Sequence, residues 1–209
     1  MVTPTFATLK EEEKDARRRL ILDTARKLFS KKDFRSVTVR QIAGTAGVSI
    51  GTIYNYYENI DDLFLDIFIK SGEEVTRLLD EKTGRMPQTS LVPMCEAYIS
   101  FLNENMTFFK MMGHFMLNGG LSSEASGKLN QIMRPIMDRI ENILIAVGVS
   151  SETRLTAHAL FSALNGIMVS YAKYPGRTPG EISLHTLRLS NIIAKVFESN
   201  KNMNHSFNN

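Results

Sequence analysis

The residues between Thr38 and Tyr57 combine hydrogen-bonding side chains with tight helical spacing, which suits them to chemistry on a polyanion. The segment reads TVRQIAGTAGVSIGTIYNYY. Its apolar residues are spaced to pack against each other, which leaves the polar residues exposed. A guanidinium can reach a phosphate, and hydroxyl, phenol and amide groups can bond the phosphates and base edges of a duplex. The predicted DNA-contacting residues are Arg40, Ser49, Ile50, Gly51, Thr52, Tyr54, Asn55 and Tyr56.

Two short helices must position these side chains, and local signals mark where each helix begins. Thr38, followed three residues later by Gln41, forms a capping box that starts the first helix, which is expected to end at Gly47. Ser49 is a second N-cap, and the helix that it starts is expected to continue through Tyr57. The N-terminus of that second helix would be an anion site. This pattern predicts a helix-turn-helix whose second helix enters the major groove.

The distribution of charge favours the same interpretation. Residues 1–58 hold 11 Lys and Arg against 7 Asp and Glu, a net charge of +4, whereas the remainder carries −1. A basic N-terminal part on a neutral body is typical of a polyanion partner. The alternative is that Tyr54, Tyr56 and Tyr57 are core aromatics of an ordinary helical domain, which each tyrosine alone would favour. The two caps, the glycine turn and the basic charge together favour DNA binding.

The segment IAGTAGVSIGTIYNYYENIDDLF resembles the DNA-binding region of TetR-family transcriptional regulators. The resemblance spans roughly Leu20 to Phe68 and includes the preceding helix, with Ala25, Leu28 and Phe29. It implies an all-helical homodimer in which three N-terminal helices bind an operator in double-stranded DNA. The C-terminal helices would bind a small effector, and the last two helices would dimerise. It also implies a repressor that the effector releases from DNA.

Two positions depart from the pattern of that family. A Lys that contacts a phosphate is frequent near the start of the family's fourth helix, and this chain has Ile60 there, beside Asp61 and Asp62. His-Phe is frequent where this chain has Tyr56 and Tyr57. A tyrosine hydroxyl still donates to a phosphate, so the same mode of binding is expected with one phosphate contact fewer.

Helical periodicity also runs through the rest of the chain, and no alternation long enough for a sheet is present. The expected fold is all-α with about nine helices. We expect a helix-turn-helix DNA-binding domain over 1–58, an effector-binding and dimerisation domain over 59–199, and a disordered Asn-rich tail over 200–209. The first helix is expected to bury one face made of Leu20, Ile21, Ala25, Leu28 and Phe29. The helices outside the motif are expected at 11–31, from Asn59, from a cap at Ser90, and at 105–117, 122–147, 151–174 and 178–199.

The C-terminal part of the chain is rich in Met and Phe, which suit an irregular apolar site. Together with the family resemblance, these segments predict a pocket for a small lipophilic or aromatic effector, with a few polar side chains to bond polar ligand atoms. The alternative is simple core packing, which is the more common role of each residue taken alone. The predicted ligand-binding residues are Tyr98, Phe101, Phe109, Met112, His114, Phe115, Met133, Met137, Asn165, Met168 and Tyr171.

Small residues recur at helical spacing after Ser151, and apolar residues recur in the last predicted helix. Small residues let a second helix approach closely, so both stripes suit a two-fold interface between two copies of the chain. The alternative is that these two helices pack against each other within one chain, and we expect some of each. The predicted interface residues are Ala159, Ala163, Gly166, Ser170, Leu184, Leu187, Ile192 and Val196.

Other classes of function have less support in the sequence. A single cysteine, Cys95, allows no intrachain disulfide and predicts a cytoplasmic protein. Neither a signal peptide nor a membrane-spanning run of about 20 apolar residues is expected. No glycine-rich phosphate loop, His/Cys metal spacing or GxSxG turn is present, so no catalysis, cofactor or metal is expected. An enzyme built on the apolar pocket and a helical adaptor are the alternatives, but the adaptor leaves the basic N-terminal part unexplained.

Overall fold

Helices are the only regular secondary structure that the computed structural model shows in the residues it describes, 5–84, 89–117 and 123–199. The all-α prediction is therefore confirmed for these residues. The elements are α1 (Phe6–Phe29), the 3₁₀ helix η1 (Phe34–Ser36), α2 (Val39–Ala46), α3 (Ile50–Tyr54), α4 (Ile60–Thr83), α5 (Val92–Glu104), α6 (Met106–Leu117), α7 (Ser123–Ala146), α8 (Thr153–Tyr171) and α9 (Pro179–Ser199).

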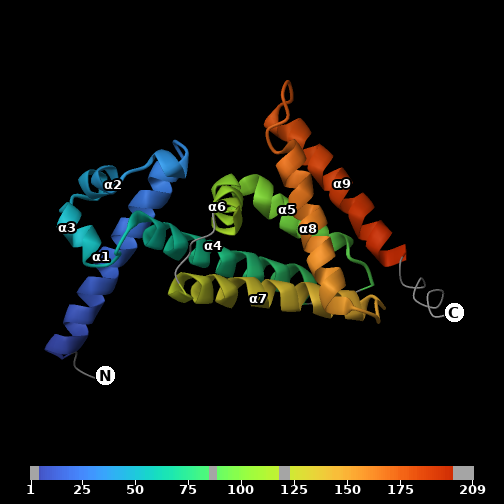
Figure 1. Cartoon of the computed structure of the whole chain (residues 1–209), viewed down its shortest axis with the longest axis horizontal. Helices are drawn as coiled ribbons and strands as arrows, with labels where there is room; N and C mark the ends of the chain where they lie inside the picture. Colours follow the sequence, from blue (N-terminus) through green and yellow to red (C-terminus); the bar gives the residue numbers. More distant parts are fainter. Residues whose placement is uncertain (1–4, 85–88, 118–122, 200–209) are drawn as a thin grey trace.

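The helices form an elongated arrangement with the N-terminal elements at one end. Figure 1 shows α1, α2 and α3 grouped at that end and α8 and α9 side by side at the other. The long helix α4 starts beside the N-terminal group and runs into the body, where it packs along α7 and against α5. Helix α9 packs on α5, and α8 packs on α7. Helix α4 therefore connects the N-terminal group to the C-terminal body.

Apolar side chains on α4 join the two ends into one continuous core. Phe64 meets Phe29 and Phe34 of the N-terminal group edge to face, with ring centroids 5.3 and 5.2 Å away. One turn further along α4, Phe68 stacks on Phe108 of α6 at 4.7 Å. Aromatic pairs at such distances contribute about 0.5–1.5 kcal/mol beyond their buried area. The start of α4 is thus held firmly under the N-terminal helices.

Side-chain caps fix the starts of α4 and α9 where the sequence predicts them. The Asn59 side chain accepts from the backbone N–H of Asp62 at 2.9 Å, and acidic residues in the first turn of α4 complement the helix dipole. Before α9, the Thr178 hydroxyl accepts from the Glu181 N–H at 3.3 Å, and the Glu181 carboxylate accepts from the Thr178 N–H at 2.8 Å. This reciprocal pair is a capping box.

Four local predictions are wrong. Helix α1 begins at Phe6, capped by Thr5, rather than at residue 11. Leu20 is 47% exposed because the neighbouring helices cover only a narrow stripe of α1, on which Leu22 is buried instead. Helix α5 has Leu91 rather than Ser90 as its N-cap residue. Helix α8 spans Thr153–Tyr171, shorter than the predicted 151–174.

A contact with α7 determines where α8 begins. Thr153 donates its hydroxyl to Glu141 of α7 at 2.7 Å, and the residue before it, Glu152, has a left-handed backbone with φ of 45°. Such tertiary contacts have no signal in the local sequence. The predicted disordered tail, 200–209, lies outside the described residues. None of the described helices combines the length and the apolar character needed to cross a bilayer.

Candidate nucleic-acid interface

Caps and one left-handed glycine set the geometry between α2 and α3. Thr38 Oγ1 accepts from the Gln41 N–H at 3.3 Å, and Gln41 Oε1 accepts from the Thr38 N–H at 3.2 Å. Gly47 ends α2 with φ of 69°, a conformation that costs other residues about 1 kcal/mol or more. Ser49 Oγ then accepts from the Thr52 N–H at 2.9 Å and starts α3. The predicted caps and turn are confirmed.

Burial of one side of α3 decides which of its residues face solvent. Ile53 is 1% exposed and lies in the core with Ile42 and Ala43 of α2. Burying an isoleucine side chain stabilises a fold by about 1.5–3 kcal/mol, so this contact holds α3 against α2. Tyr54, the residue after Ile53, is 53% exposed. The other predicted DNA-contacting residues are all exposed or half-buried: Arg40, Ser49, Ile50, Gly51, Thr52, Asn55 and Tyr56.

Helix α3 is shorter than the sequence predicts, because it ends at Tyr54 rather than continuing through Tyr57. Asn55 is its C-cap, and the backbone N–H groups of Tyr56 and Tyr57 both donate to the Ile53 carbonyl, at 3.0 and 3.1 Å. This turn directs Tyr57 into the core, where it is 6% exposed. Of the three tyrosines, Tyr57 therefore fits the alternative of a core aromatic.

The buried end of Tyr57 joins a polar cluster that holds three elements together. Its hydroxyl donates to Asp66 of α4 at 2.7 Å, and Arg18 of α1 donates to the same carboxylate at 2.8 and 3.1 Å. Arg18 also lies 3.4 Å from the Tyr57 hydroxyl. Burial raises the pKa of Tyr57, so its phenol stays a neutral donor. This cluster has no local signal in the sequence, because its members lie 9 to 48 residues apart.

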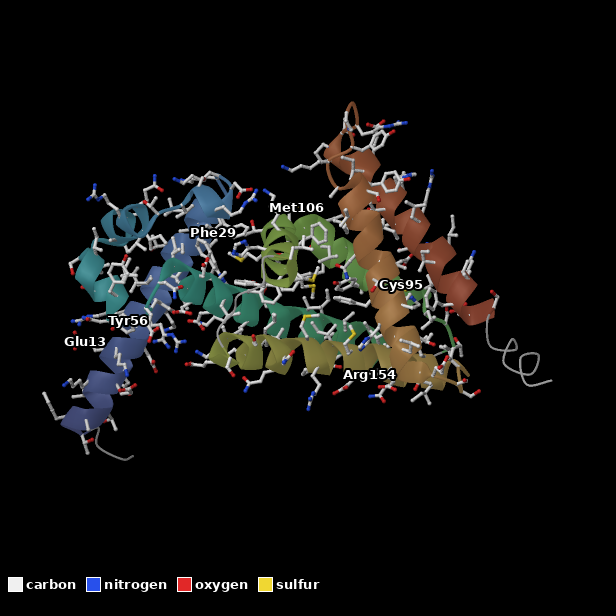
Figure 2. The ribbon with its side chains drawn as sticks, in the orientation of Figure 1. Glu13, Phe29, Tyr56, Cys95, Met106 and Arg154 are labelled. Atoms are coloured by element: carbon white, nitrogen blue, oxygen red, sulfur yellow. The ribbon has the colours of Figure 1, made fainter. Side chains whose placement is uncertain are left out.

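Tyr56 lies beside α1, where it shares the wall of a surface groove with Arg18 (Figure 2). The exposed side chain of Arg40 adds positive charge on α2. Lys32 donates to Gln41 Oε1 at 2.7 Å and so braces the same capping box. The surface around α2 and α3 therefore combines cations with exposed hydrogen-bonding groups, which is what a phosphate backbone and base edges require.

Helix α6 makes a second contact with the N-terminal group. Lys110 pairs with Asp33 at 3.0 Å, and hydrogen bonds from Arg35 and Lys110 lower the pKa of Asp33 to about 2. His114 lies 3.6 Å from Asp61 at the start of α4, and its ring meets Phe34 edge to face at 5.6 Å. His114, predicted as a ligand-binding residue, is therefore placed at the boundary with the N-terminal helices.

Several other predicted ligand-binding residues are packed in the core. Tyr98 donates its hydroxyl to Asn165 Oδ1 at 3.2 Å, and burial raises its pKa. Phe109 and Asn165 are half-buried. The fully buried members are Tyr98, Phe101, Met112, Phe115 and Met168. None of these residues lines a surface groove described here, and their contacts agree with the alternative of core packing.

Three of the predicted ligand-binding residues line the open grooves described here. Met133 and Met137 line a groove of about 490 Å³ between α7 and α8. Tyr171 lines another, of about 500 Å³, at the end of α8. The first groove also contains four residues that were not predicted from the sequence: Arg134, Arg154, His158 and Phe161. In the sequence, this groove is indicated by the spacing of Leu129, Met133 and Met137 along one face of a helix.

Helices α8 and α9 leave a set of large apolar side chains exposed although they pack on each other. Val169 is 77% exposed and Ile192 is 57% exposed. Of the predicted interface residues, Ala163 and Leu187 are half-buried and the rest are exposed: Ala159, Gly166, Ser170, Leu184, Ile192 and Val196. These helices thus pack within the chain and also present an unpartnered apolar surface.

The described residues contain no cluster of three or more His, Cys, Asp or Glu side chains able to hold a metal ion. Cys95 is fully buried, and burial raises its pKa to about 12. A thiol in that state is a packing residue and not a nucleophile.

Helix α2, the left-handed turn at Gly47 and the capped, exposed helix α3 together form a helix-turn-helix. This motif defines a class of DNA-binding proteins. Residues 21–67 match the profile of the family described as bacterial regulatory proteins, tetR family. Residues 21–67 therefore carry the DNA-binding region of that family.

Similarity to curated transcriptional regulators extends beyond these residues. The HTH-type transcriptional regulator AcrR of Shigella flexneri is 33% identical over 102 residues, which cover 49% of this chain and 47% of AcrR. The fatty acid metabolism regulator protein of Bacillus subtilis is 23% identical over 162 residues, 72% of this chain and 81% of that protein. The chain spans about half or less of the length of the first curated relatives it matches.

Solved structures share the fold over most of the chain. FadR from Bacillus subtilis, in complex with stearoyl-CoA, has a TM-score of 0.69 at 18% identity over 87% of this chain and 97% of its own. The TetR-family regulator PfmR from Thermus thermophilus has a TM-score of 0.62 at 20% identity over 84% of this chain and 97% of its own. At these identities the likeness shows the fold.

Proposed function

We propose that this protein is a transcriptional repressor that binds a palindromic operator as a homodimer and is released by a small lipophilic effector. Residues 1–58 would form the DNA-binding domain, and residues 59–199 would bind the effector and dimerise. The observation that carries this proposal is the geometry of α3, in which Ile53 is buried while Tyr54 is 53% exposed beside an exposed Asn55. A DNA partner would place the protein in the cytoplasm.

The exposed residues divide into two roles in this proposal. Thr52 and Asn55 would meet base edges, because hydroxyl and amide groups can discriminate between base pairs. Arg40, Ser49 and Tyr56 would meet phosphates and fix the register of the helix on the duplex. Gly51 and Ile50 lie in the first turn of α3, where the backbone would approach the DNA closely.

Dimerisation would give the complex its symmetry. Each chain carries one recognition helix, so a two-fold dimer requires two half-sites about 34–36 Å apart or a modest multiple of that spacing. The exposed apolar side chains of α8 and α9, at the end opposite to α3, support a pairing surface there. That placement would leave both recognition helices free to meet one face of the duplex.

Binding of an effector would act through α4. The start of α4 is packed under the N-terminal helices by Phe64, and its later turns pack along α7. The structure of FadR from Bacillus subtilis holds stearoyl-CoA, which supports a lipophilic effector for a protein of the same fold. A ligand that moves α7 would tilt α4 and change the separation of the two recognition helices.

The DNA-binding part is tested by selecting duplexes with the full chain and measuring affinity by fluorescence anisotropy across a salt series. We expect a palindromic consensus and an affinity that falls steeply with salt, because the phosphate contacts dominate binding. The Asn55→Ala variant serves as a control for specific readout. Binding that does not change with salt, or a monomer at micromolar concentration, would contradict the proposal.

The effector-dependent part is tested by calorimetry of a candidate ligand with and without operator DNA. A ligand shifts the equilibrium only by its differential affinity for the two states. The operator should therefore weaken ligand binding by the same factor as the ligand weakens operator binding, typically about 5–150-fold. Equal ligand affinity in both titrations would exclude that ligand as an inducer. A reporter behind the operator that rises when the gene is removed would identify a repressor, and one that falls would identify an activator.

A further inference from the structure

The groove between α7 and α8 differs in its chemistry from the three other grooves described here. Its floor is apolar, with Met133 and Met137 of α7 facing Phe161 of α8. Leu129 of α7 and Met116 of α6 extend this floor. Its volume, about 490 Å³, lies within the range of about 300–1,000 Å³ that is common for small-molecule sites.

The polar side chains that line this groove are neutral or basic. They are Asn130, Arg134, Arg154, His158 and Ser162, and no carboxylate is among the described residues that line it. The other three grooves described here each contain at least one carboxylate: Glu181 at the end of α8, Asp33, Glu74 and Glu104 beside α6, and Glu58, Asp62, Asp66 and Glu124 beside α1. Among these four grooves, the α7–α8 groove is therefore the one whose charge favours an anion.

The two arginines of the groove are in different states. Arg154 pairs with Asp138 and, at 3.2 Å, with Glu141 of α7, and Figure 2 shows it where α7 and α8 meet. These two carboxylates neutralise the charge of Arg154, so this residue holds α8 against α7. Arg134 is exposed and forms no ion pair or hydrogen bond with any other described residue. Its guanidinium is available for a ligand at the rim of an apolar floor.

We propose that this groove binds an amphipathic anion, an acyl or alkyl chain that ends in a carboxylate or a phosphate. The chain would cover the Met and Phe floor, and Arg134 would receive the anionic head group, with His158 as a second donor. Guanidinium pairs with both carboxylate and phosphate by two parallel N–H bonds. This inference rests on the proposed function, since it assigns the chemical class of the effector.

The position of the groove suits an effector site because α7 cannot move without affecting α4. A Cβ atom placed on Gly72 of α4 would lie 2.2 Å from Cγ2 of Ile132. The two helices thus touch at a glycine, and Ile132 directly precedes Met133 of the groove floor. A ligand that displaces Met133 would press Ile132 against α4.

The test uses the full chain and three ten-carbon probes: decanoate and decyl phosphate below their critical micelle concentrations, and neutral decan-1-ol below its solubility limit. Calorimetry should show that at least one anion binds tenfold or more tightly than the alcohol. The Arg134→Gln variant should lose about tenfold in affinity for that anion and keep its affinity for the alcohol. The relative affinities of decanoate and decyl phosphate identify the head group. The control is Arg77→Gln, an exposed arginine of α4 outside the groove, which should bind all three probes as the unmodified protein does.

Three outcomes would overturn the inference. If the alcohol binds as tightly as the anions and Arg134→Gln has no effect, the ligand needs no anionic head, although a lipophilic effector survives. If no probe binds while the protein still binds its operator, the groove is not the site, and the DNA-binding function stands. If decanoate converts the dimer to a monomer in sedimentation experiments, a second copy of the chain occupies the groove. Failure of operator binding itself would instead count against the proposed function.

Discussion

The three residues that follow α3 differ sharply in their exposure to solvent. Asn55 is exposed, Tyr56 is half-buried beside α1, and Tyr57 is buried against α4. In the proposed complex, the exposed amide at the C-cap of α3 would read a base edge, whereas the half-buried phenol would present only its hydroxyl to the backbone of the duplex. The three residues are thus expected to affect specificity, affinity and stability, respectively.

The Tyr56→Phe substitution should weaken binding to all duplexes alike, by about 1 kcal/mol or roughly fivefold, because it removes one hydroxyl from a phosphate contact. Asn55→Ala should instead change the preferred sequence. Both are checked by anisotropy on a panel of duplexes together with a new selection for each variant. Our assignment of roles would be reversed if Tyr56→Phe altered the consensus while Asn55→Ala left it unchanged.

Tyr57→Phe should lower the free energy of unfolding by about 1 kcal/mol, because Asp66 loses one of its donors in a partly buried cluster. For a chain of this size, the expected fall in Tm is about 2–4 °C per kcal/mol. Thermal unfolding followed by circular dichroism measures the change. The matched control is Tyr54→Phe, whose ring is 53% exposed and whose loss of a hydroxyl should leave Tm unchanged. Equal effects of the two substitutions would argue against a structural role for the Arg18–Tyr57–Asp66 cluster.

At the scale of the elements, the contact between α4 and α7 determines how a movement of one helix affects the other. Helix α4 reaches from the N-terminal group into the body, and α7 lies along it. Gly72 permits the close approach, because Ile132 occupies the space that a Cβ atom would need. Isoleucine is β-branched and has one strongly preferred rotamer in a helix, so it cannot easily move aside.

Gly72→Ala should therefore destabilise the protein by about 1–3 kcal/mol, as overpacking of a core contact does. The control is Gly127→Ala in α7, where a Cβ atom would meet nothing within 4 Å. That substitution should stabilise the helix by up to about 1 kcal/mol, because alanine has the better helix propensity. Urea unfolding of both variants measures the two free energies. A neutral Gly72→Ala would mean that the two helices are free to separate, and that α7 does not push on α4.

At the scale of the whole molecule, two features remain without a partner in a single chain. One is the exposed surface of α3, and the other is the apolar side of α8 and α9 at the opposite end. An apolar patch of large side chains on a folded chain marks an interaction surface. Pairing of two copies through α8 and α9 would cover the apolar side and leave α3 available.

Val169→Asp and Ile192→Asp should each convert a dimer to a monomer, because each would place a charge in an apolar contact without a partner. Side chains at these positions are 77% and 57% exposed in the single chain, so the monomer should still fold. Ile145→Asp in α7, at a position with 53% exposure, is the matched control and should remain dimeric. Sedimentation equilibrium gives the oligomeric state, and operator affinity should fall with it. Dimers in all three variants would place the interface elsewhere.

The sequence alone was sufficient for features whose causes lie within a few residues of one another. The capping box of Thr38 and Gln41, the turn at Gly47 and the caps at Ser49, Asn59 and Thr178 are such features, and the structure confirms each one. Apolar periodicity likewise predicted an all-α chain. Hydrogen bonds between a side chain and a backbone group three residues away, and the φ angle of one glycine, depend little on the rest of the molecule.

Only the tertiary structure decided which surfaces those helices cover. Leu20 is exposed and Tyr57 is buried, because burial depends on what packs against a residue and not on its own type. Helix α3 also ends earlier than predicted. Arg18 pairs with Asp66, which lies 48 residues away in the sequence. Arg154 pairs with Glu141, whereas Arg134 has no ion-pair partner among the described residues. Many predicted pocket residues became core for the same reason: a methionine or phenylalanine fills a cavity or lines one with equal ease, and the placement of the neighbouring helices determines which.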